Sequence, residues 1–547
     1  MIRPRESRVP SPIVVLVVLL LVAAACEPTA TPSSAAPGSP SPGPTVVAAL
    51  PTPLATPAPT LAPTPAPTAT VVHRPLVPVT DFRAPWTETS AAEVAAVLAG
   101  TSERYEAIEV LESQRFKVLV ALGTGLPDPT AHLIVAPSLA TLRSDLASSR
   151  KRLAFLVVDD VDPSVRALGW EGAFLFGGDR VATAAEWPLQ AEFRASPGGD
   201  PGIAAGGYDP ATAWTLVAGG DILLDRGVAL AIQGSASGVD FPWDGGTVKI
   251  TSRCRDCSVF GWDLPRTERT GGEGAMRDLL TGADLAIANF ENPAPEAYRF
   301  HDHGTVFSAN PAYIEGLVNA GLDYVSLANN HIRDAGARGI LETIDALDGF
   351  GIAHSGAGAN LAAARAPALL EAGGVTVGIL GYDTIAGGYF AGADRAGSAP
   401  LTAENVRADV AAARAAGADL VIVFPHWGTE YDPTPFAGQR KLAEAAIDAG
   451  ADMVIGNHAH WAAGIEVYKG KPIWYALGNF VFDQTWSEPT MEGITLELTF
   501  SGAGLVQVRM RPHLILDRAQ PNLMEPAASG AVVMGQVWAA SKGLLDW

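Results

Sequence analysis

Apolar and polar positions follow a regular order over the larger, C-terminal part of the chain. Short apolar runs of strand length recur there, and most of them end in polar or charged residues. Runs bounded in this way predict short buried strands. They cover residues 214–221, 283–292, 322–331, 375–383, 419–428, 451–460 and 471–483.

Longer stretches with one apolar face lie between several of these runs and predict helices. Several of them stop at a glycine, as helix C-termini commonly do. They cover residues 312–321, 336–351, 403–417 and 438–450. Two later runs, 494–502 and 506–516, alternate like antiparallel strands. The pattern predicts a layered or sandwiched α/β domain over 211–516, followed by a C-terminal extension over 517–547.

A smaller α/β domain is predicted over residues 76–210, because strand-like and helix-like stretches alternate there as well. It is loosely similar to half of a periplasmic binding protein, and a structural or docking module fits the pattern equally well. The expected strands are 116–123, 132–137, 152–159 and 172–178, and the expected helices are 90–100 and 139–149.

The N-terminus is typical of an exported protein. Residues 1–26 combine early arginines, an apolar run and small residues that end at Cys26, and so resemble a bacterial lipoprotein signal. Lipidation of Cys26 would anchor the protein on the outer face of the cytoplasmic membrane. An uncleaved anchor helix and an ordinary cleaved signal are the alternatives. Residues 27–75 are rich in Pro, Ala and Thr, which predicts a disordered, extended linker.

Charge and cysteine content narrow the function classes. The formal net charge of −21 over 547 residues argues against a nucleic-acid partner, because phosphate backbones require basic surfaces. Cys254 and Cys257 are the only cysteines after Cys26, too few for a four-thiolate zinc site. Outside the cytoplasm we expect them to form a local disulfide, and a redox role is the weaker alternative.

Chemistry-bearing residues gather at the ends of the predicted strands, where ligands collect in α/β sheets. Imidazole and carboxylate ligands suit Mn, Fe or Zn, and a pair of ions needs a bridging carboxylate. Each residue alone has a structural explanation as a cap, a turn or a hydrogen-bonded core group, but the joint pattern predicts a metal site. The residues are Asp221, Glu291, Asn329, Asn330, His331, His426, His458 and His460.

Five stretches in this order resemble the CapA, or poly-γ-glutamate capsule-synthesis, family, which is considered a branch of the calcineurin-like metallophosphoesterases. They read AGGDILLDRGV, ADLAIANFENP, SLANNHIRDAG, FPHWGTEYDPTP and the segment from GNHAH to LGNFVFDQ. The resemblance implies a calcineurin-like α/β sandwich. It also implies one or two divalent metals, an anionic polymer or phosphoester as substrate, and capsule-export membrane proteins as partners.

The resemblance also implies a role for each matching residue. Metal ligation is implied for Asp221, Glu291, Asn330, His426, His458 and His460, with Glu291 in the place of a bridging aspartate. His331 corresponds to the residue that protonates the leaving group. A supporting role or a substrate contact is implied for Asn329, Glu430 and Asn479, and Arg226 lies near a motif end where it can offset the charge of an anionic ligand.

One departure from the metallophosphoesterases concerns the first motif. Leu223 stands where their second first-motif ligand, a histidine, is found, so one ion would lose a nitrogen ligand. The site then binds that ion weakly or holds a single metal, unless His301 or His303 supplies the ligand.

Three functions stay open at this level. The first is a hydrolase in which a metal-activated water attacks a phosphoester. The second is a non-catalytic factor that binds or assembles an anionic polymer, and the third is hydrolysis of γ-glutamyl amide bonds. The strong negative charge of the chain favours an enzyme over a carrier of polyanions.

Overall fold

The computed structural model describes residues 70–125, 130–195 and 207–547. The export signal, Cys26 and nearly all of the Pro-rich linker lie outside these residues and stay predictions. Within them, no helix has the length and apolar character needed to cross a bilayer.

The N-terminal part is built on one mixed sheet with the strand order β4-β3-β5-β1-β6, and β8 also pairs with β1. Its strands are β1 (Thr70–Asp81), β3 (Ala107–Leu111), β4 (Leu133–Ala136), β5 (Arg152–Val157), β6 (Val165–Ala167) and β8 (Gln190–Ala195), with a small pair β2 (Glu88–Thr89) and β7 (Gly169–Trp170). Its helices are α1 (Ala91–Leu98), α2 (Arg115–Ala121) and α3 (Leu139–Ser148). β1 begins inside the segment assigned to the linker.

Two strands expected in this part were wrong. Residues 116–121 lie in α2 instead, with Val118 and Leu119 buried and Phe116 exposed. A short apolar run does not distinguish a strand from a buried helix turn, and here the helical alternative holds. Residues 172–178 form turns, bends and isolated β-bridges, with Gly172 and Gly177 in the left-handed region.

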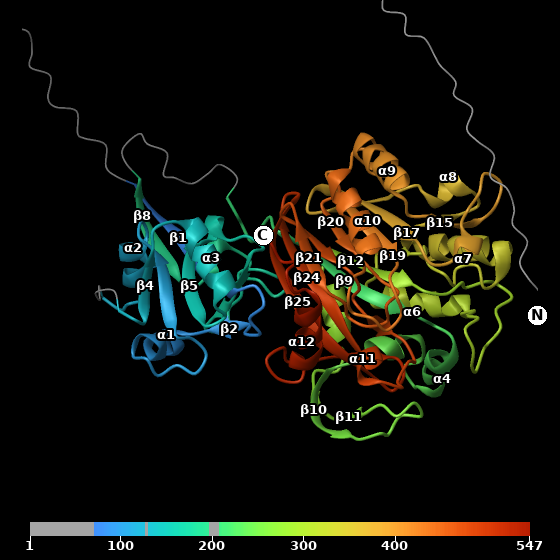
Figure 1. Cartoon of the computed structure of the whole chain (residues 1–547), viewed down its shortest axis with the longest axis horizontal. Helices are drawn as coiled ribbons and strands as arrows, with labels where there is room; N and C mark the ends of the chain where they lie inside the picture. The colour runs from blue at the N-terminus through green and yellow to red at the C-terminus, as the bar shows by residue number, and fades with distance from the viewer. Residues whose placement is uncertain (1–69, 126–129, 196–206) are drawn as a thin grey trace, which may run out of the picture. The chain divides into compact units, whose positions relative to one another are not determined.

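The C-terminal part contains two large sheets (Figure 1). The first has the order β11-β10-β26-β25-β24-β9-β12-β13-β14, with β23 beside β9. Its strands are β9 (Trp214–Ile222), β10 (Thr247–Cys254), β11 (Leu264–Gly271), β12 (Leu285–Phe290), β13 (Tyr324–Ser326), β14 (Ala353–Ser355), β23 (Asn479–Val481), β24 (Glu492–Ser501), β25 (Gly504–Leu516) and β26 (Gln520–Leu523).

The second sheet has the order β16-β17-β19-β20-β22-β21. Its strands are β16 (Ala368–Ala372), β17 (Val375–Asp383), β19 (Leu420–His426), β20 (Met453–Ile455), β21 (Ile465–Tyr468) and β22 (Lys471–Trp474), and a separate pair is β15 (Ala357–Gly358) with β18 (Gly397–Ser398). The predicted run 471–483 is therefore two strands, β22 and β23, which belong to different sheets.

The helices of this part are α4 (Arg226–Gly234), α5 (Ala275–Thr281), α6 (Ile314–Asn319), α7 (Gly336–Phe350), α8 (Leu361–Ala364), α9 (Ala403–Ala415), α10 (Ala437–Asp448), α11 (Glu488–Met491) and α12 (Ala531–Ala540). Residues 517–547 were predicted to be a separate C-terminal extension. They contribute β26 to the first sheet, and Val537 of α12 belongs to the main core.

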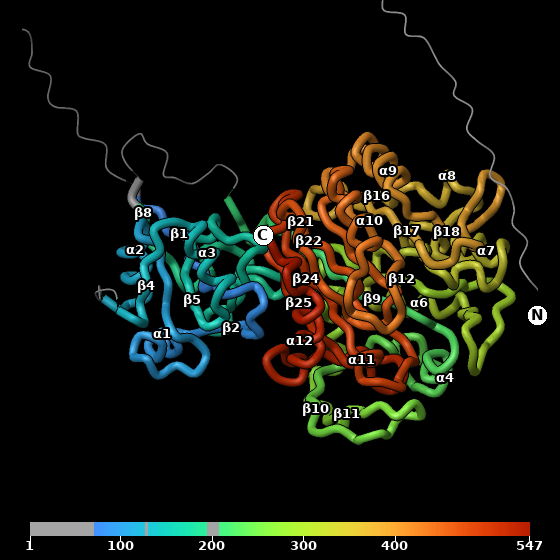
Figure 2. Tube along the Cα trace, viewed as in Figure 1, coloured from blue at the N-terminus to red at the C-terminus, as the bar shows by residue number. Residues whose placement is uncertain are grey.

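The main core lies between the two sheets. Leu216 and Ile287 of the first sheet belong to one buried cluster with Ile379 and Ile422 of the second. Separate clusters join the first sheet to α4–α7 and the second sheet to α9 and α10. This arrangement confirms the predicted α/β sandwich preceded by a smaller α/β unit. Figure 2 shows the β10–β11 hairpin at the margin of the C-terminal part, near α11.

The core between the sheets predicts a large effect of cavity formation. We expect Leu496→Ala, which truncates a fully buried side chain on β24, to lower the free energy of unfolding by about 2–5 kcal/mol. Leu369→Ala on β16, where the side chain is 43% exposed, is the control and should change it by less than about 0.5 kcal/mol. Denaturant unfolding of both variants tests this, and equal effects would contradict a core at Leu496.

Candidate metal centre

Five of the six candidate metal ligands come from four strand ends that meet at one edge of the sandwich, and the sixth lies in the loop after β13. Asp221 lies at the end of β9 and Glu291 directly follows β12, which pairs with β9 in parallel. His426 ends β19, and the loop with His458 and His460 follows the parallel strand β20. Since parallel strands end on the same side, their polar ends converge.

Glycine permits the close approach that places Asp221. The amide N–H of Asp221 donates to the carbonyl oxygen of Gly478 at 3.2 Å. A Cβ atom on Gly220 would collide with that same carbonyl group. The Gly-Gly-Asp sequence therefore lets β9 lie directly against the segment that leads into β23.

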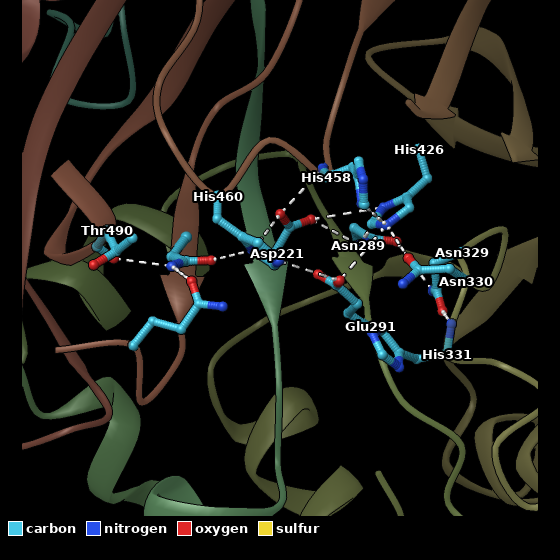
Figure 3. Close-up of polar contacts among 12 residues, drawn as sticks. Asp221, Asn289, Glu291, Asn329, Asn330, His331, His426, His458, His460 and Thr490 are labelled. Atoms are coloured by element: carbon cyan, nitrogen blue, oxygen red, sulfur yellow. Dashed lines mark hydrogen bonds and ion pairs between the residues drawn. The ribbon is translucent and has the colours of Figure 1, made fainter. Parts of the chain in front are cut away.

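One set of ligand atoms surrounds a first candidate ion position. His426 Nε2 lies 3.0 Å from His458 Nδ1, 2.7 Å from Asn330 Oδ1 and 3.6 Å from Glu291 Oε1. Donors that each lie about 2.1 Å from a tetrahedral ion are about 3.4 Å apart. The three separations from His426 Nε2, between 2.7 and 3.6 Å, lie around that spacing (Figure 3).

A second candidate position shares Glu291 with the first. Asp221, Glu291 and His460 each offer a ligand atom within 4.8 Å of the other two. His460 Nε2 lies 3.8 Å from Glu291 Oε1. Glu291 thus lies where a carboxylate that bridges two ions is needed, and the second position has one imidazole rather than two.

The second ion position lacks a second imidazole nitrogen because Leu223 stands where a histidine ligand was expected from the resemblance. Leu223 is fully buried in an apolar cluster with Phe307, Phe482 and Ile515. His301 bonds Asp225 through Nδ1 at 2.7 Å, and it belongs to neither cluster of ligand atoms among the described residues. The His303 side chain is 88% exposed.

Backbone strain marks the His-x-His loop. His458 has φ = 93° and His460 has φ = 56°, both in the left-handed region that residues with a Cβ rarely adopt. The loop turns the two histidines toward different ion positions. His458 faces Glu291 and His426, and His460 faces Asp221 and Glu291.

Hydrogen bonds from neighbouring amides orient the candidate ligands. Asn479 Oδ1 lies 2.8 Å from His460 Nδ1, and the Asn479 amide nitrogen donates to Thr490 O at 2.9 Å. Because an amide oxygen only accepts, His460 carries its proton on Nδ1 and Nε2 is left for a cation. Asn289 donates to Asp221 Oδ1 at 2.8 Å.

His331 forms a separate unit beside the ligand cluster. Its Nδ1 lies 2.9 Å from Asp334 Oδ2, and its ring packs on Phe307 at 4.2 Å between centroids. Asn329 accepts from the His331 backbone N–H and donates to Phe290 O at 2.8 Å, which joins this loop to the end of β12. The carboxylate of Asp334 holds the proton on Nδ1 and leaves Nε2 for proton exchange.

The remaining predicted residues are Arg226, Glu430 and the two cysteines, and none of them belongs to the ligand clusters among the described residues. Arg226 pairs with Asp483 and lies over the Phe307 ring at 4.7 Å. Glu430 is exposed, and its charge acts on Glu291. Cys254 and Cys257 form a disulfide at the end of β10, as expected for a local pair.

Burial dominates the titration of the centre. It raises the pKa of Asp221 to about 7 and the pKa of Glu291 well above its usual value, with the Asp221 charge as a further cause for Glu291. It lowers the pKa of His458 to about 4 and that of His460 to about 3, and the pKa of His426 falls well below its usual value. The imidazoles are therefore neutral and available as ligands at neutral pH.

The residues present fit a divalent cation. Neither carboxylate oxygen of Glu291 has a hydrogen-bond partner among the described residues, although both are buried. Buried carboxylates are normally paired, hydrogen-bonded or bound to a metal. Two carboxylates, an amide oxygen and three neutral imidazoles form a donor set suited to Mn, Fe or Zn.

Comparison with known proteins shows the family of this chain. A sequence profile described as "Bacterial capsule synthesis protein PGA_cap" matches residues 215–484, which include all six candidate ligands. A probable polyglutamine synthesis accessory protein of Mycobacterium tuberculosis is 35% identical over 295 residues, which cover 49% of this chain and 74% of the relative. The chain belongs to the PGA_cap, or CapA, family.

Two further likenesses are more limited. The capsule biosynthesis protein CapA of Bacillus anthracis is 34% identical over 256 residues, 45% of this chain and 60% of that protein. The chain thus spans about 60% of the length of that relative. A 5'-nucleotidase precursor from Thermus thermophilus aligns at 16% identity over 60% of this chain and 58% of that chain, with a TM-score of 0.34, too low to support a function.

Sequence reasoning missed two supporting residues of this CapA-family site. Asn289 lies two positions before Glu291, so the two-residue period of an extended chain places both side chains on one side at the end of β12. Asp334 lies three positions after His331, the spacing of a local turn. Both signals are visible in the sequence, but neither residue type stands out without the contact it makes.

Burial of Asp221 predicts a pH-dependent cost in the metal-free protein. Its folded pKa is raised, so it favours folding while protonated and loses that contribution as pH rises toward about 7. With metal removed by a chelator, we expect Asp221→Asn to increase the free energy of unfolding at pH 8. The increase should be smaller at pH 5. Urea unfolding at both values measures this.

Asp302→Asn, at a 73% exposed side chain, is the control and should change stability by less than about 0.5 kcal/mol at either pH. Equal stabilisation by Asp221→Asn at pH 5 and pH 8, or none at pH 8, would contradict a buried ionised Asp221.

Proposed function

We propose that this CapA-family protein is a metal-dependent phosphoesterase of the cell envelope that acts in the synthesis of a capsule or another anionic exopolymer. The observation that carries the proposal is the pair of ligand sets that share Glu291, whose buried oxygens lack partners among the described residues. The printed names of the relatives, capsule biosynthesis and polyglutamine synthesis, support a role in polymer synthesis.

In this proposal Glu291, Asn330, His426 and His458 hold one ion, and Asp221, Glu291 and His460 hold the other. Bound ions at such a site activate a water and neutralise charge that develops on a phosphoryl group. The buried walls keep bulk water away from the ligands, and Asn289 and Asn479 keep Asp221 and His460 in position.

His331 is the proposed general acid. The Asp334 carboxylate accepts the Nδ1 proton and fixes the ring, so Nε2 is the atom that gives a proton to the leaving oxygen. Phe307 packs on the ring and restricts its rotation. Protonation of the leaving oxygen by Nε2 completes cleavage of the ester bond.

The proposed setting is the outer face of the cytoplasmic membrane, with the protein anchored through lipidated Cys26 and in contact with membrane proteins of polymer export. The family name supports an envelope role. The competing function is a non-catalytic factor that uses the same cation centre to hold an anionic polymer. Cleavage of γ-glutamyl amides by this centre is a further alternative that a γ-glutamyl peptide tests directly.

His331→Asn tests the catalytic part of the proposal. We expect kcat for an aryl phosphodiester to fall about 10²–10⁴-fold, with bound metal unchanged, because the general acid is lost and the ligands remain. The assay uses the full chain supplied with Mn, Fe or Zn. His354→Asn is a matched control, since His354 also pairs with an aspartate, at 3.2 Å, and lies outside the site. Absence of turnover in the wild type with each metal would favour the non-catalytic alternative.

Asn479→Leu tests the orienting hydrogen bond. Loss of the acceptor for His460 Nδ1 should weaken metal affinity about 10–100-fold, as measured by competition with a fluorescent chelator. Asn319→Leu, which removes a surface contact with Asp240, should leave the affinity unchanged. An unchanged affinity in Asn479→Leu would exclude this residue from metal support.

A further inference from the structure

Five aromatic side chains form a connected surface beside the metal centre. We name this set the aromatic platform, and its members are Phe260, Trp262, Tyr431, Trp461 and Trp486. Tyr431 lies on His460 with 5.9 Å between ring centroids and an interplanar angle of 28°. Trp461 directly follows His460 in the chain. The platform therefore begins at a candidate metal ligand.

From Tyr431 the platform continues outward to the β10–β11 hairpin. Tyr431 contacts Trp486 at 5.0 Å, and Trp486 contacts Phe260 at 5.6 Å and Trp262 at 6.2 Å between centroids. Trp262 also contacts Trp461 at 5.9 Å. Phe260 is 69% exposed and Trp262 is 39% exposed, so the outer rings are accessible rather than part of a core.

The hairpin that carries the outer rings is held by several bonds. Cys254 and Cys257 are joined by a disulfide, and Asp256 N–H donates to Asp263 Oδ1 at 3.0 Å. Arg253 makes two hydrogen bonds of 2.6 Å with the Glu488 carboxylate of α11. The exposed rings are thus attached to a braced loop that keeps them at the surface. Exposed apolar patches of this kind mark interaction sites.

The geometry of the rings selects among ligands. Interplanar angles within the platform run from 57° to 87°, so these pairs offer no parallel slot for a planar base. The exposed rings of Phe260 and Trp262 suit the C–H face of a saturated sugar ring. Asp263 and Glu430, each next in sequence to a platform ring, are exposed carboxylates and disfavour a polyanion. The indole N–H of Trp461 is buried and has no acceptor among the described residues.

We propose that the aromatic platform binds a neutral sugar ring of the substrate, so that this site acts on a glycosyl phosphoester. This inference rests on the proposed phosphoesterase function only for cleavage of the phosphoester bond. Binding of the sugar by the platform is independent of catalysis.

The test is calorimetric titration of the full chain with chitotetraose as the neutral sugar probe. We expect binding by the wild type, affinity at least tenfold weaker in Trp262→Ala, and partial recovery in Trp262→Phe. Phe350→Ala, at a 40% exposed ring on α7, is the control and should bind as the wild type does. Because Trp262 is partly exposed, its variants should unfold much as the wild type does. Unfolding curves of the variants check this.

Two comparisons separate this inference from the proposed catalysis. His426→Ala removes a candidate metal ligand that is not part of the platform. It should abolish phosphodiester turnover and retain chitotetraose affinity. No binding of chitotetraose, equal binding by Trp262→Ala, or tighter Trp262-dependent binding of adenosine or of γ-linked tetraglutamate would overturn the sugar assignment, whatever the outcome of the hydrolase assay.

Discussion

The arrangement of the C-terminal domain depends on two carboxylates buried side by side. Asp221 and Glu291 are fully buried, and burial raises the pKa of both. Two adjacent carboxylates in a low-dielectric site repel each other, and an ionised pair is tolerated only with compensating charge. The imidazoles around them are neutral, because burial lowers the pKa of His426, His458 and His460. A divalent cation is the partner that this set of donors lacks.

The two-sheet architecture explains how such a centre is assembled from distant residues. β9 and β12 bring the carboxylates from the first sheet, and β19 and β20 bring the imidazoles from the second. The chain crosses between the sheets from β22 to β23, and that crossing places Asn479 against His460. The strained backbone at His458 and His460 is the cost of directing two neighbouring histidines toward two positions.

Much of this was predictable from the sequence, and the failures have physical reasons. Strand runs that end in polar residues predicted both the sandwich and the gathering of Asp221, Glu291, Asn330 and the histidines, because such runs determine where strands end. The strand predicted over 116–123 was wrong because the length and apolar content of this run suit a strand or a short helix equally.

Other features depend on contacts that no sequence pattern reveals. Asn289, Asp334 and the orienting role of Asn479 appear only once strands distant in the chain are paired. The aromatic platform likewise joins the β10–β11 hairpin to residues more than 150 positions later. A family resemblance indicates ligand positions, but the substrate-facing surface has to be obtained from the structure.

The most direct measurement of the central claim is the metal content of the full chain. After loading with Mn, Zn or Fe and removal of free metal, about two ions per chain are predicted for the wild type. The variant with His458→Ala and His460→Ala should retain little or none while it remains folded. A folded wild-type protein that holds no ion after loading with each metal would contradict the account.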